Sequence, residues 1–195
     1  FVEDTAVVTR HGAIIARPGA PSRQGEVTVI REVLESQYAT VAEITAPGTL
    51  DGGDICQADG HFFIGLSHRT NEEGARQLTS WLSRFGYTAS TISIRESREL
   101  LHLKSGIAWL GDRHFVVAEA LAGHPALRGY EQLVASREET YAANCVRVND
   151  AVLVPSGLPA LARRIAAIGR EVIELDVSEF RKMDGGLSCL SIRLP

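Results

Sequence analysis

The chain has 195 residues, 45% of them hydrophobic and 23% charged, which is the composition of a folded globular protein and excludes extended disorder. Its formal net charge of −4 and its pI near 5.9 remove the electrostatic argument for a nucleic-acid partner, which requires a basic stripe. Small cationic ligands suit this charge better.

The predicted elements repeat along the chain. The sequence starts within a predicted strand over residues 1–8, with no initiating methionine. The apolar runs 6–9 and 13–16 flank a polar turn, and residues 17–22 form a loop. A helical period then continues through Val27, Ile30, Val33 and Leu34.

The same order of paired runs, loop and helix returns in a second copy. Its runs at 55–56 and 62–64 flank a turn, and the loop 67–71 precedes a helix with Ala75, Leu78, Trp81 and Leu82 on one face. Further predicted parts are the paired runs 106–110 with 114–117 and 145–148 with 151–154, an exposed loop at 118–128, a helix over 158–168, and strands at 171–175 and 187–194.

Corresponding runs recur about every 40 to 50 residues, a spacing typical of repeat architectures. Each module is too small to bury a core alone, so we expect an α/β fold in which the modules surround an axis as a propeller. A single α+β layer fold with coincidental similarity between segments remains the alternative. We expect one domain over residues 1–195.

Compartment and partners follow from features that the chain lacks. Three cysteines, with no metal-binding spacing, favour a reducing compartment over a disulfide framework. No run approaches the roughly 18 apolar residues of a membrane span, and no signal-peptide pattern is present. We therefore expect a cytoplasmic protein with no membrane partner.

Cys189 is the first candidate for chemistry. It follows Gly185 and Gly186, which allow a tight turn and a close approach to a ligand, as suits a nucleophile at the rim of a cavity. The alternative is a small buried side chain within the strand 187–194.

His102 is flanked by apolar residues, so we expect a partly dry environment in which its pKa is adjustable. Such an imidazole delivers a proton to a leaving amine and later takes one from water. The alternative is a core histidine with satisfied hydrogen bonds. The other histidines lie in polar, turn-like segments.

Acids and arginines suggest the ligand. Asp51 and Asp54 flank two glycines, and either acid is placed to orient His102 or to pair with a cation; the alternative is ordinary turn chemistry. Arg23 and Arg69 stand at equivalent loop-to-helix junctions, where a guanidinium binds a carboxylate or remains solvated. Acids on one side of a pocket and arginines on the other would suit a zwitterionic ligand, with its carboxylate at the arginines and its cationic far end at the acids.

Several blocks together resemble one family. They are residues 1–4, 17–23, 50–54, 65–71, 101–105, 143–145 and 184–189. In this order they are similar to the dimethylarginine dimethylaminohydrolases. The resemblance implies a pentein-like, five-bladed α/β propeller of ββαβ modules. It also implies a further module before Phe1, so that the chain is a fragment or part of an assembly such as a homodimer.

The resemblance also assigns roles. It implies that Cys189 is the nucleophile, that His102 is the general acid and base, and that Asp51 orients the histidine and contacts the guanidinium. The residues expected to bind the substrate are Glu3, Asp4, Arg23, Arg69 and Met183, with Asp4 on the guanidinium and the two arginines on the substrate carboxylate.

The implied reaction is hydrolysis of an Nω-methylated arginine to citrulline and a methylamine through a covalent thiouronium, with no metal or organic cofactor. Relatives that hydrolyse arginine or agmatine carry an aspartate where this chain has Lys104, which favours the methylarginine branch. The alternatives are an arginine deiminase or amidinotransferase activity on another guanidine, and a non-catalytic module that binds an amino acid.

Overall fold

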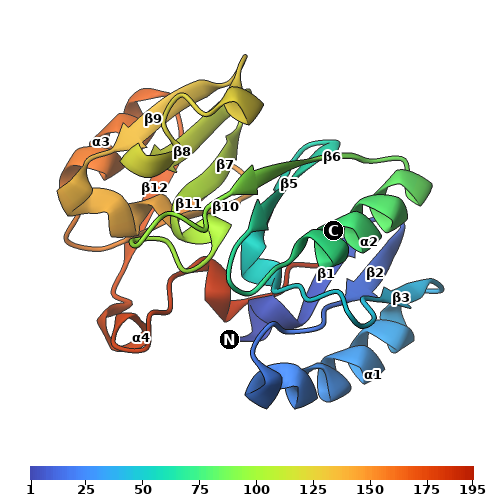
Figure 1. The fold of residues 1–195 in the computed structure, drawn as a ribbon. Helices are drawn as coiled ribbons and strands as arrows, with labels where there is room; N and C mark the ends of the chain where they lie inside the picture. Colours follow the sequence, from blue (N-terminus) through green and yellow to red (C-terminus); the bar gives the residue numbers. More distant parts are fainter. The chain divides into compact units, whose positions relative to one another are not determined.

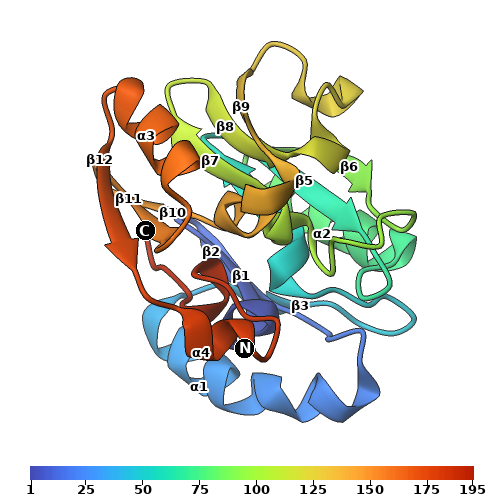
Figure 2. The ribbon, with the colours of Figure 1, turned by 90° about the vertical axis from the view of Figure 1, so that its left-hand side faces the viewer.

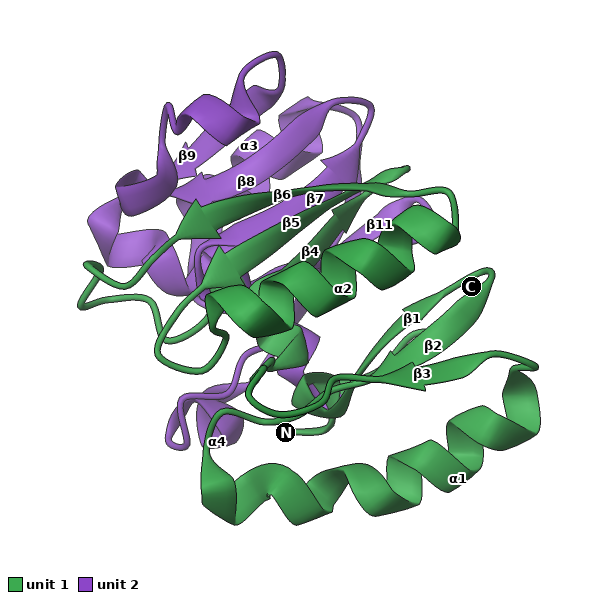
Figure 3. Cartoon of the chain, turned by 45° about the vertical axis from the view of Figure 1, so that its right-hand side comes forward, with its two compact units in different colours: residues 1–103, 191–195 green, residues 104–190 purple.

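The computed structural model describes all residues, 1–195, as two compact units (Figure 1). The first unit comprises residues 1–103 and 191–195, and the second comprises residues 104–190 (Figure 3). Each unit contains two three-stranded sheets, and the expectation that residues 1–195 form a single domain stays a prediction.

The first unit contains the strands β1 (Ala6–Thr9), β2 (Gly12–Ile15), β3 (Val41–Glu43), β4 (Ile55–Ala58), β5 (His61–Leu66) and β6 (Thr88–Ser93), with the helices α1 (Val27–Gln37) and α2 (Glu72–Arg84). The second unit contains β7 (Ile107–Gly111), β8 (His114–Ala118), β9 (Glu131–Ala135), β10 (Val146–Val148), β11 (Ala151–Pro155) and β12 (Glu171–Leu175), with α3 (Pro159–Ala167) and α4 (Ser178–Arg181).

Every sheet has the same topology. Its first two strands form an antiparallel hairpin, and the third strand lies parallel to the second after a crossover. The second unit follows the same rule. A parallel neighbour requires a crossover connection, and α1, α2 and α3 lie in three of the four crossovers. The expected ββαβ repeat is therefore present.

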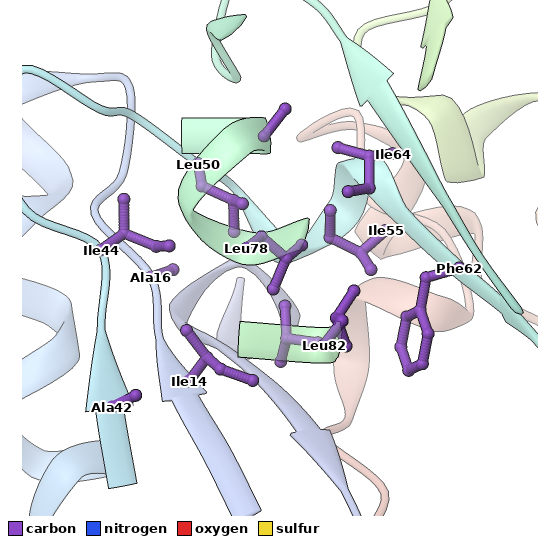
Figure 4. Close-up of a cluster of buried hydrophobic side chains, with 12 residues drawn as sticks. Ile14, Ala16, Ala42, Ile44, Leu50, Ile55, Phe62, Ile64, Leu78 and Leu82 are labelled. Carbon is purple, nitrogen blue, oxygen red and sulfur yellow. The ribbon is translucent and has the colours of Figure 1, made fainter. Parts of the chain in front are cut away.

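The core of the first unit is centred on α2 (Figure 4). Leu78 and Leu82 are fully buried, with Ile14 of the first sheet on one side and Phe62 and Ile64 of the second sheet on the other. One helix therefore joins the two sheets by burying apolar side chains of both.

The second unit repeats this arrangement around α3 (Figure 2). Leu161 and Ile165 of α3 are fully buried in one cluster with Val116 of β8 and Val152 and Val154 of β11. The two helices therefore serve the same structural purpose in the two units.

Strand β2 explains why its sequence lacks the usual alternation of polar and apolar residues. Ile14 faces the cluster around α2, whereas Ala13 and Ile15 face Leu34 of α1. Because successive side chains point to opposite faces, a strand that is covered on both sides is apolar throughout.

Two predicted strands are wrong. Residues Val2–Thr5 form a 3₁₀ helix, and only Ala6–Thr9 is a strand. The predicted strand at 187–194 is replaced by a 3₁₀ helix at Ser188–Leu190 followed by irregular chain, because Gly186 and Leu187 accept backbone hydrogen bonds locally.

The structure adds elements that the sequence pattern did not predict. The third strands β3, β6 and β9 were missed, and the predicted loop at 118–128 contains 3₁₀ helices at Glu119–Leu121 and Pro125–Leu127. No helix of the structure is long and apolar enough to cross a membrane.

The core of the first unit gives a stability prediction. We expect Leu78→Ala to lower the free energy of unfolding by about 2–5 kcal/mol, because the cavity it creates lies between two sheets that cannot close it. Urea unfolding followed by Trp81 fluorescence in a Trp109→Phe background measures this loss. The control Val29→Ala removes a side chain that is 66% exposed and should change little; similar midpoints for both variants would contradict the prediction.

Candidate active site

The candidate site begins at Asp51, which immediately precedes a short 3₁₀ helix, Gly52–Asp54. Its side chain is completely buried. The backbone N–H of Gly19 donates to its Oδ1 at 2.8 Å, and its Oδ2 lies 3.0 Å from Nε2 of His102. The residue pattern left open whether Asp51 or Asp54 contacts the histidine, the resemblance implied Asp51, and in the structure Asp51 makes the contact.

The two glycines after Asp51 are required by close approach. A Cβ on Gly52 would lie 2.0 Å from the carbonyl oxygen of Glu3. A Cβ on Gly53 would lie 2.7 Å from Oδ1 of Asp4 and 2.9 Å from Cγ of His102. These glycines therefore let three separate segments of the first unit meet.

Asp4 is the second carboxylate at this point and is 3% exposed. It lies on the 3₁₀ helix Val2–Thr5, and its Oδ1 accepts the backbone N–H of Gly53 at 2.9 Å. The same oxygen lies 3.9 Å from Nε2 of His102. Glu3 is also buried, on the same 3₁₀ helix.

His102 lies in the expected dry environment and is 7% exposed. Desolvation alone would lower the pKa of its imidazole. The hydrogen bond to Asp51 and the negative charges of Asp54, Asp4 and Asp51 outweigh desolvation and raise that pKa above its ordinary value. The protonated imidazole is therefore favoured at this position.

The two acids of the 51–54 segment respond differently to burial. Desolvation would raise the pKa of Asp51, but hydrogen bonds from His102 and Gly19, with the charges of His102 and Arg69, lower it. The pKa of Asp54 is raised because desolvation dominates there. Asp54 does not hydrogen-bond the imidazole; it accepts hydrogen bonds from Ser67, Thr70 and the backbone of Leu103.

The arginines lie closer to the acids than the sequence suggested. Arg23 does not face Asp4 across a pocket: its Nη1 forms an ion pair with Asp4 at 2.9 Å and lies 3.8 Å from Asp51, while Glu26 also binds its guanidinium. Nη1 of Arg69 lies 3.9 Å from Oδ2 of Asp51, and this buried nitrogen makes no hydrogen bond.

The ligand atoms of Asp4, Asp51 and His102 lie within 4.8 Å of one another, which is close enough to surround a metal ion. The guanidinium of Arg23 already binds Asp4, and that of Arg69 adds positive charge beside Asp51. These positive groups disfavour the binding of a metal ion at this point, whereas the planar guanidinium of a ligand matches the geometry of the carboxylates.

Cys189 and Met183 belong to the second unit. Cys189 is partly exposed, on the 3₁₀ helix Ser188–Leu190, and its Sγ accepts the backbone N–H of Gly186 at 3.5 Å. The interpretation of Cys189 as a strand residue is therefore wrong. Met183 is 74% exposed.

Asn144 holds the cysteine turn and was not among the predicted site residues. Its amide donates to the carbonyl of Lys104 and to the hydroxyl of Ser188, and its Oδ1 accepts the backbone N–H of Ser188. A Cβ on Gly186 would lie 2.5 Å from that Oδ1. Asn144 directly precedes Cys145 in one of the blocks that carry the resemblance, and this was the available signal.

Comparisons with known proteins agree on one family. An N(G),N(G)-dimethylarginine dimethylaminohydrolase of Pseudomonas aeruginosa is 43% identical over 99% of this chain and 75% of its own length. A protein of the same name from Streptomyces coelicolor is 34% identical over 100% of this chain and 73% of its own. This chain belongs to the dimethylarginine dimethylaminohydrolase family. A family model described as arginine deiminase also matches residues 1–131.

Solved structures give the same family and confirm the expected α/β fold. A dimethylarginine dimethylaminohydrolase of Pseudomonas aeruginosa, complexed with citrulline, has a TM-score of 0.94 and 42% identity, covering 97% of this chain and 74% of that one. An arginine dihydrolase from cyanobacteria has a TM-score of 0.89, covering 100% of this chain and 74% of that one. Its 19% identity shows a shared fold alone.

Gly53 gives a prediction for this dimethylarginine dimethylaminohydrolase-family site. We expect Gly53→Ala to cost about 1–3 kcal/mol of unfolding free energy and to displace Asp4 or His102, because the added methyl group has no room. Gly25→Ala is the control, since Gly25 also lies in a 3₁₀ helix but has open space around its Cβ position. Equal urea midpoints for the two variants would show that the close approach is unimportant.

The raised pKa of His102 predicts a pH-dependent contribution to stability. A histidine whose pKa is higher in the folded than in the unfolded chain stabilises the fold fully below the unfolded value near 6.5. This stabilisation disappears as the pH rises through the folded-state pKa. We therefore expect the wild type to be more stable than His102→Gln at pH 6, and this difference in the free energy of unfolding to decrease as the pH is raised above 6. A difference that grows with pH would mean that desolvation dominates.

Proposed function

We propose that this protein hydrolyses Nω-methylated arginine to citrulline and a methylamine. The observation that carries the proposal is the buried cluster of Asp4, Asp51 and His102, in a chain 43% identical to a dimethylarginine dimethylaminohydrolase. Carboxylates that converge on one imidazole suit a cationic substrate and a proton-transfer step.

The carboxylates are the binding site for the substrate guanidinium. Asp4 already binds a guanidinium, that of Arg23, at 2.9 Å. In the complex, the substrate takes this place and Arg23 turns away towards the substrate carboxylate, as the resemblance implies. Glu3, next to Asp4, and the exposed Met183 complete the proposed contacts.

Arg69 supports the binding of the other end of the substrate. Its Nη1 is buried without a hydrogen-bond acceptor, which costs about 1–3 kcal/mol for a polar group. A ligand carboxylate would supply this acceptor and recover the cost. An amino acid with a free carboxylate and a guanidinium is thus the class of substrate that satisfies both sets of charges.

In the proposed reaction the thiolate of Cys189 adds to the guanidinium carbon, forming a C–S bond. His102, protonated, gives its proton to the departing nitrogen, and the C–N bond breaks to release the methylamine. The remaining S-alkylthiouronium is hydrolysed: neutral His102 takes a proton from water, the oxygen adds to the same carbon, and the C–S bond breaks. The C–S electrons return to sulfur and regenerate the Cys189 thiolate, and the proton that remains on the product oxygen passes to the released methylamine or to solvent, which leaves neutral citrulline.

The raised pKa of His102 supports its proposed role as an acid, because the imidazole stays protonated at a pH where an ordinary histidine is neutral. Asp51 fixes the ring through the 3.0 Å contact at Nε2 and stabilises the positive charge. The donor from Gly186 lies where it can stabilise negative charge on the sulfur of Cys189.

The mechanism predicts the effect of two substitutions in the full-length protein. We expect Cys189→Ser to abolish citrulline release and His102→Gly to lower its rate by about 10²- to 10⁴-fold, with an unchanged circular-dichroism spectrum. The control His11→Gly changes an exposed histidine of the same unit and should retain activity. Full activity in either site variant would remove the mechanism.

A second candidate is hydrolysis of arginine itself, favoured by the match of residues 1–131 to an arginine deiminase model. Arginine, agmatine and dimethylarginine assayed side by side, with detection of ammonia and methylamines, separate these activities. A non-catalytic amino-acid-binding module would instead give a calorimetric binding signal for arginine with no turnover.

Location and assembly are further proposals. A cytoplasmic location is supported by the three cysteines, none of which forms a disulfide, as is usual in a reducing compartment. A homodimer remains the proposed assembly.

A further inference from the structure

We propose that Asp54 is a positioning residue that fixes the relative position of Asp51 and His102 and keeps the imidazole of His102 protonated. The kinetic consequence of this role rests on the proposed function. Asp54 is completely buried, and the proposed reaction gives it no contact with the substrate. A buried carboxylate is costly unless donors surround it, so its surroundings indicate what it does.

Three donors point at this carboxylate. Its Oδ2 accepts the hydroxyl groups of Thr70 at 2.6 Å and Ser67 at 2.7 Å, and its Oδ1 accepts the backbone N–H of Leu103 at 2.9 Å. Leu103 directly follows His102. The backbone of the candidate acid and base is therefore attached to Asp54.

The directions of the hydroxyl groups are fixed by their other partners. The Ser67 oxygen accepts the backbone N–H groups of Arg69 and Thr70, and the Thr70 oxygen accepts the backbone N–H of Asp51. Each hydroxyl proton is left to point at Asp54, which acts only as an acceptor. These donors favour the ionised carboxylate and oppose the desolvation that raises the pKa of Asp54.

Asp54 is consequently connected to the imidazole through two sets of hydrogen bonds. One route runs through Thr70 to the backbone of Asp51, whose side chain contacts His102 at 3.0 Å. The other runs through Leu103 to the backbone of His102. Because both partners of the Asp51–His102 contact depend on one carboxylate, a change at Asp54 alters their relative position.

Gly65 shows that the fold leaves space for this carboxylate. A Cβ on Gly65 would lie 2.7 Å from Cβ of Leu103 and 2.9 Å from Oδ1 of Asp54. The donors to Asp54 are neutral groups, whereas the charged group that acts on it is His102. A charge that served only to fill the core would be replaced at lower cost by an apolar side chain.

The test is the titration of His102 in Asp54→Asn. An asparagine of the same shape has one oxygen and cannot accept all three donors, and it removes one negative charge. The charged groups around the imidazole are then Asp4 and Asp51, with Arg23 and Arg69 beside them. We expect the NMR titration of isotopically labelled His102, assigned with His102→Gln, to move to lower pH.

The kinetic readout separates positioning from binding. We expect Asp54→Asn to lower kcat for dimethylarginine by roughly 10- to 100-fold, as a small misplacement of catalytic groups does, with a smaller change in KM. The pH dependence of kcat should move in the same direction as the titration of His102. An unchanged titration in the folded variant overturns the proposal.

Thr70 provides a second test if Asp54→Asn does not fold. Thr70→Val keeps the shape but removes the hydroxyl between Asp54 and Asp51, whereas Thr70→Ser keeps the hydroxyl. We expect Thr70→Val to shift the His102 titration downward and Thr70→Ser to restore most of it. Thr79→Val is the matched control, because the Thr79 hydroxyl bonds Ala75 within α2. Equal titrations in Thr70→Val and Thr79→Val overturn the proposal.

The two proposals fail in different ways. Absence of methylamine release by the wild type would remove the proposed function, yet the titration of His102 in the variants would still decide the role of Asp54. Methylamine release that is retained along with an unchanged titration in Asp54→Asn would remove the role of Asp54 and leave the proposed function intact.

Discussion

The first unit depends on the burial of three carboxylates, Asp4, Asp51 and Asp54, around the single imidazole of His102. Removing an ion from water costs several kcal/mol even after the protein relaxes. The fold offsets this cost with backbone N–H groups, hydroxyl groups and one guanidinium, so each carboxylate has at least one donor within 3.0 Å. The result is a rigid negative environment that favours a protonated histidine and a cationic ligand.

This requirement explains the local backbone. Extended strands direct their N–H groups to neighbouring strands, whereas a 3₁₀ turn leaves its first N–H groups for other acceptors. The N–H of Gly53 is used in this way by Asp4, and the missing side chains of Gly52 and Gly53 let Glu3, Asp4 and His102 approach. The acidic residues that seem to interrupt strands therefore lie on or beside the 3₁₀ turns that precede β1 and β4.

The sequence predicted the hairpins, the helices α1, α2 and α3 and the third strand β12, but not the third strands β3, β6 and β9, for a physical reason. Hairpins such as β1–β2 consist of apolar runs that are covered on both faces, and α2 has a clear apolar face. In contrast, strand β6 (Thr88–Ser93) contains mostly small and polar residues. Its only fully buried residue is Ile92. Its parallel pairing with β5 depends on the crossover and not on its own pattern. The turn at Cys189 likewise depends on Asn144, which lies far away in the sequence.

The repeat also explains where the candidate site residues lie. Each hairpin is preceded by a 3₁₀ helix: Val2–Thr5 before β1, Gly52–Asp54 before β4, Leu103–Ser105 before β7 and Arg137–Ala143 before β10. Asp4, Asp51, His102 and Asn144 lie on or directly beside these four turns, and Cys189 lies on a further one, Ser188–Leu190. Arg23 and Arg69 lie in the connections that follow β2 and β5, Arg23 on the 3₁₀ helix Pro21–Glu26 before α1 and Arg69 in the loop before α2. The repeated module therefore places Asp4, Asp51, His102 and Asn144 at one recurring position, the turn before a hairpin, so the apolar runs that reveal the repeat also locate most of the candidate site residues.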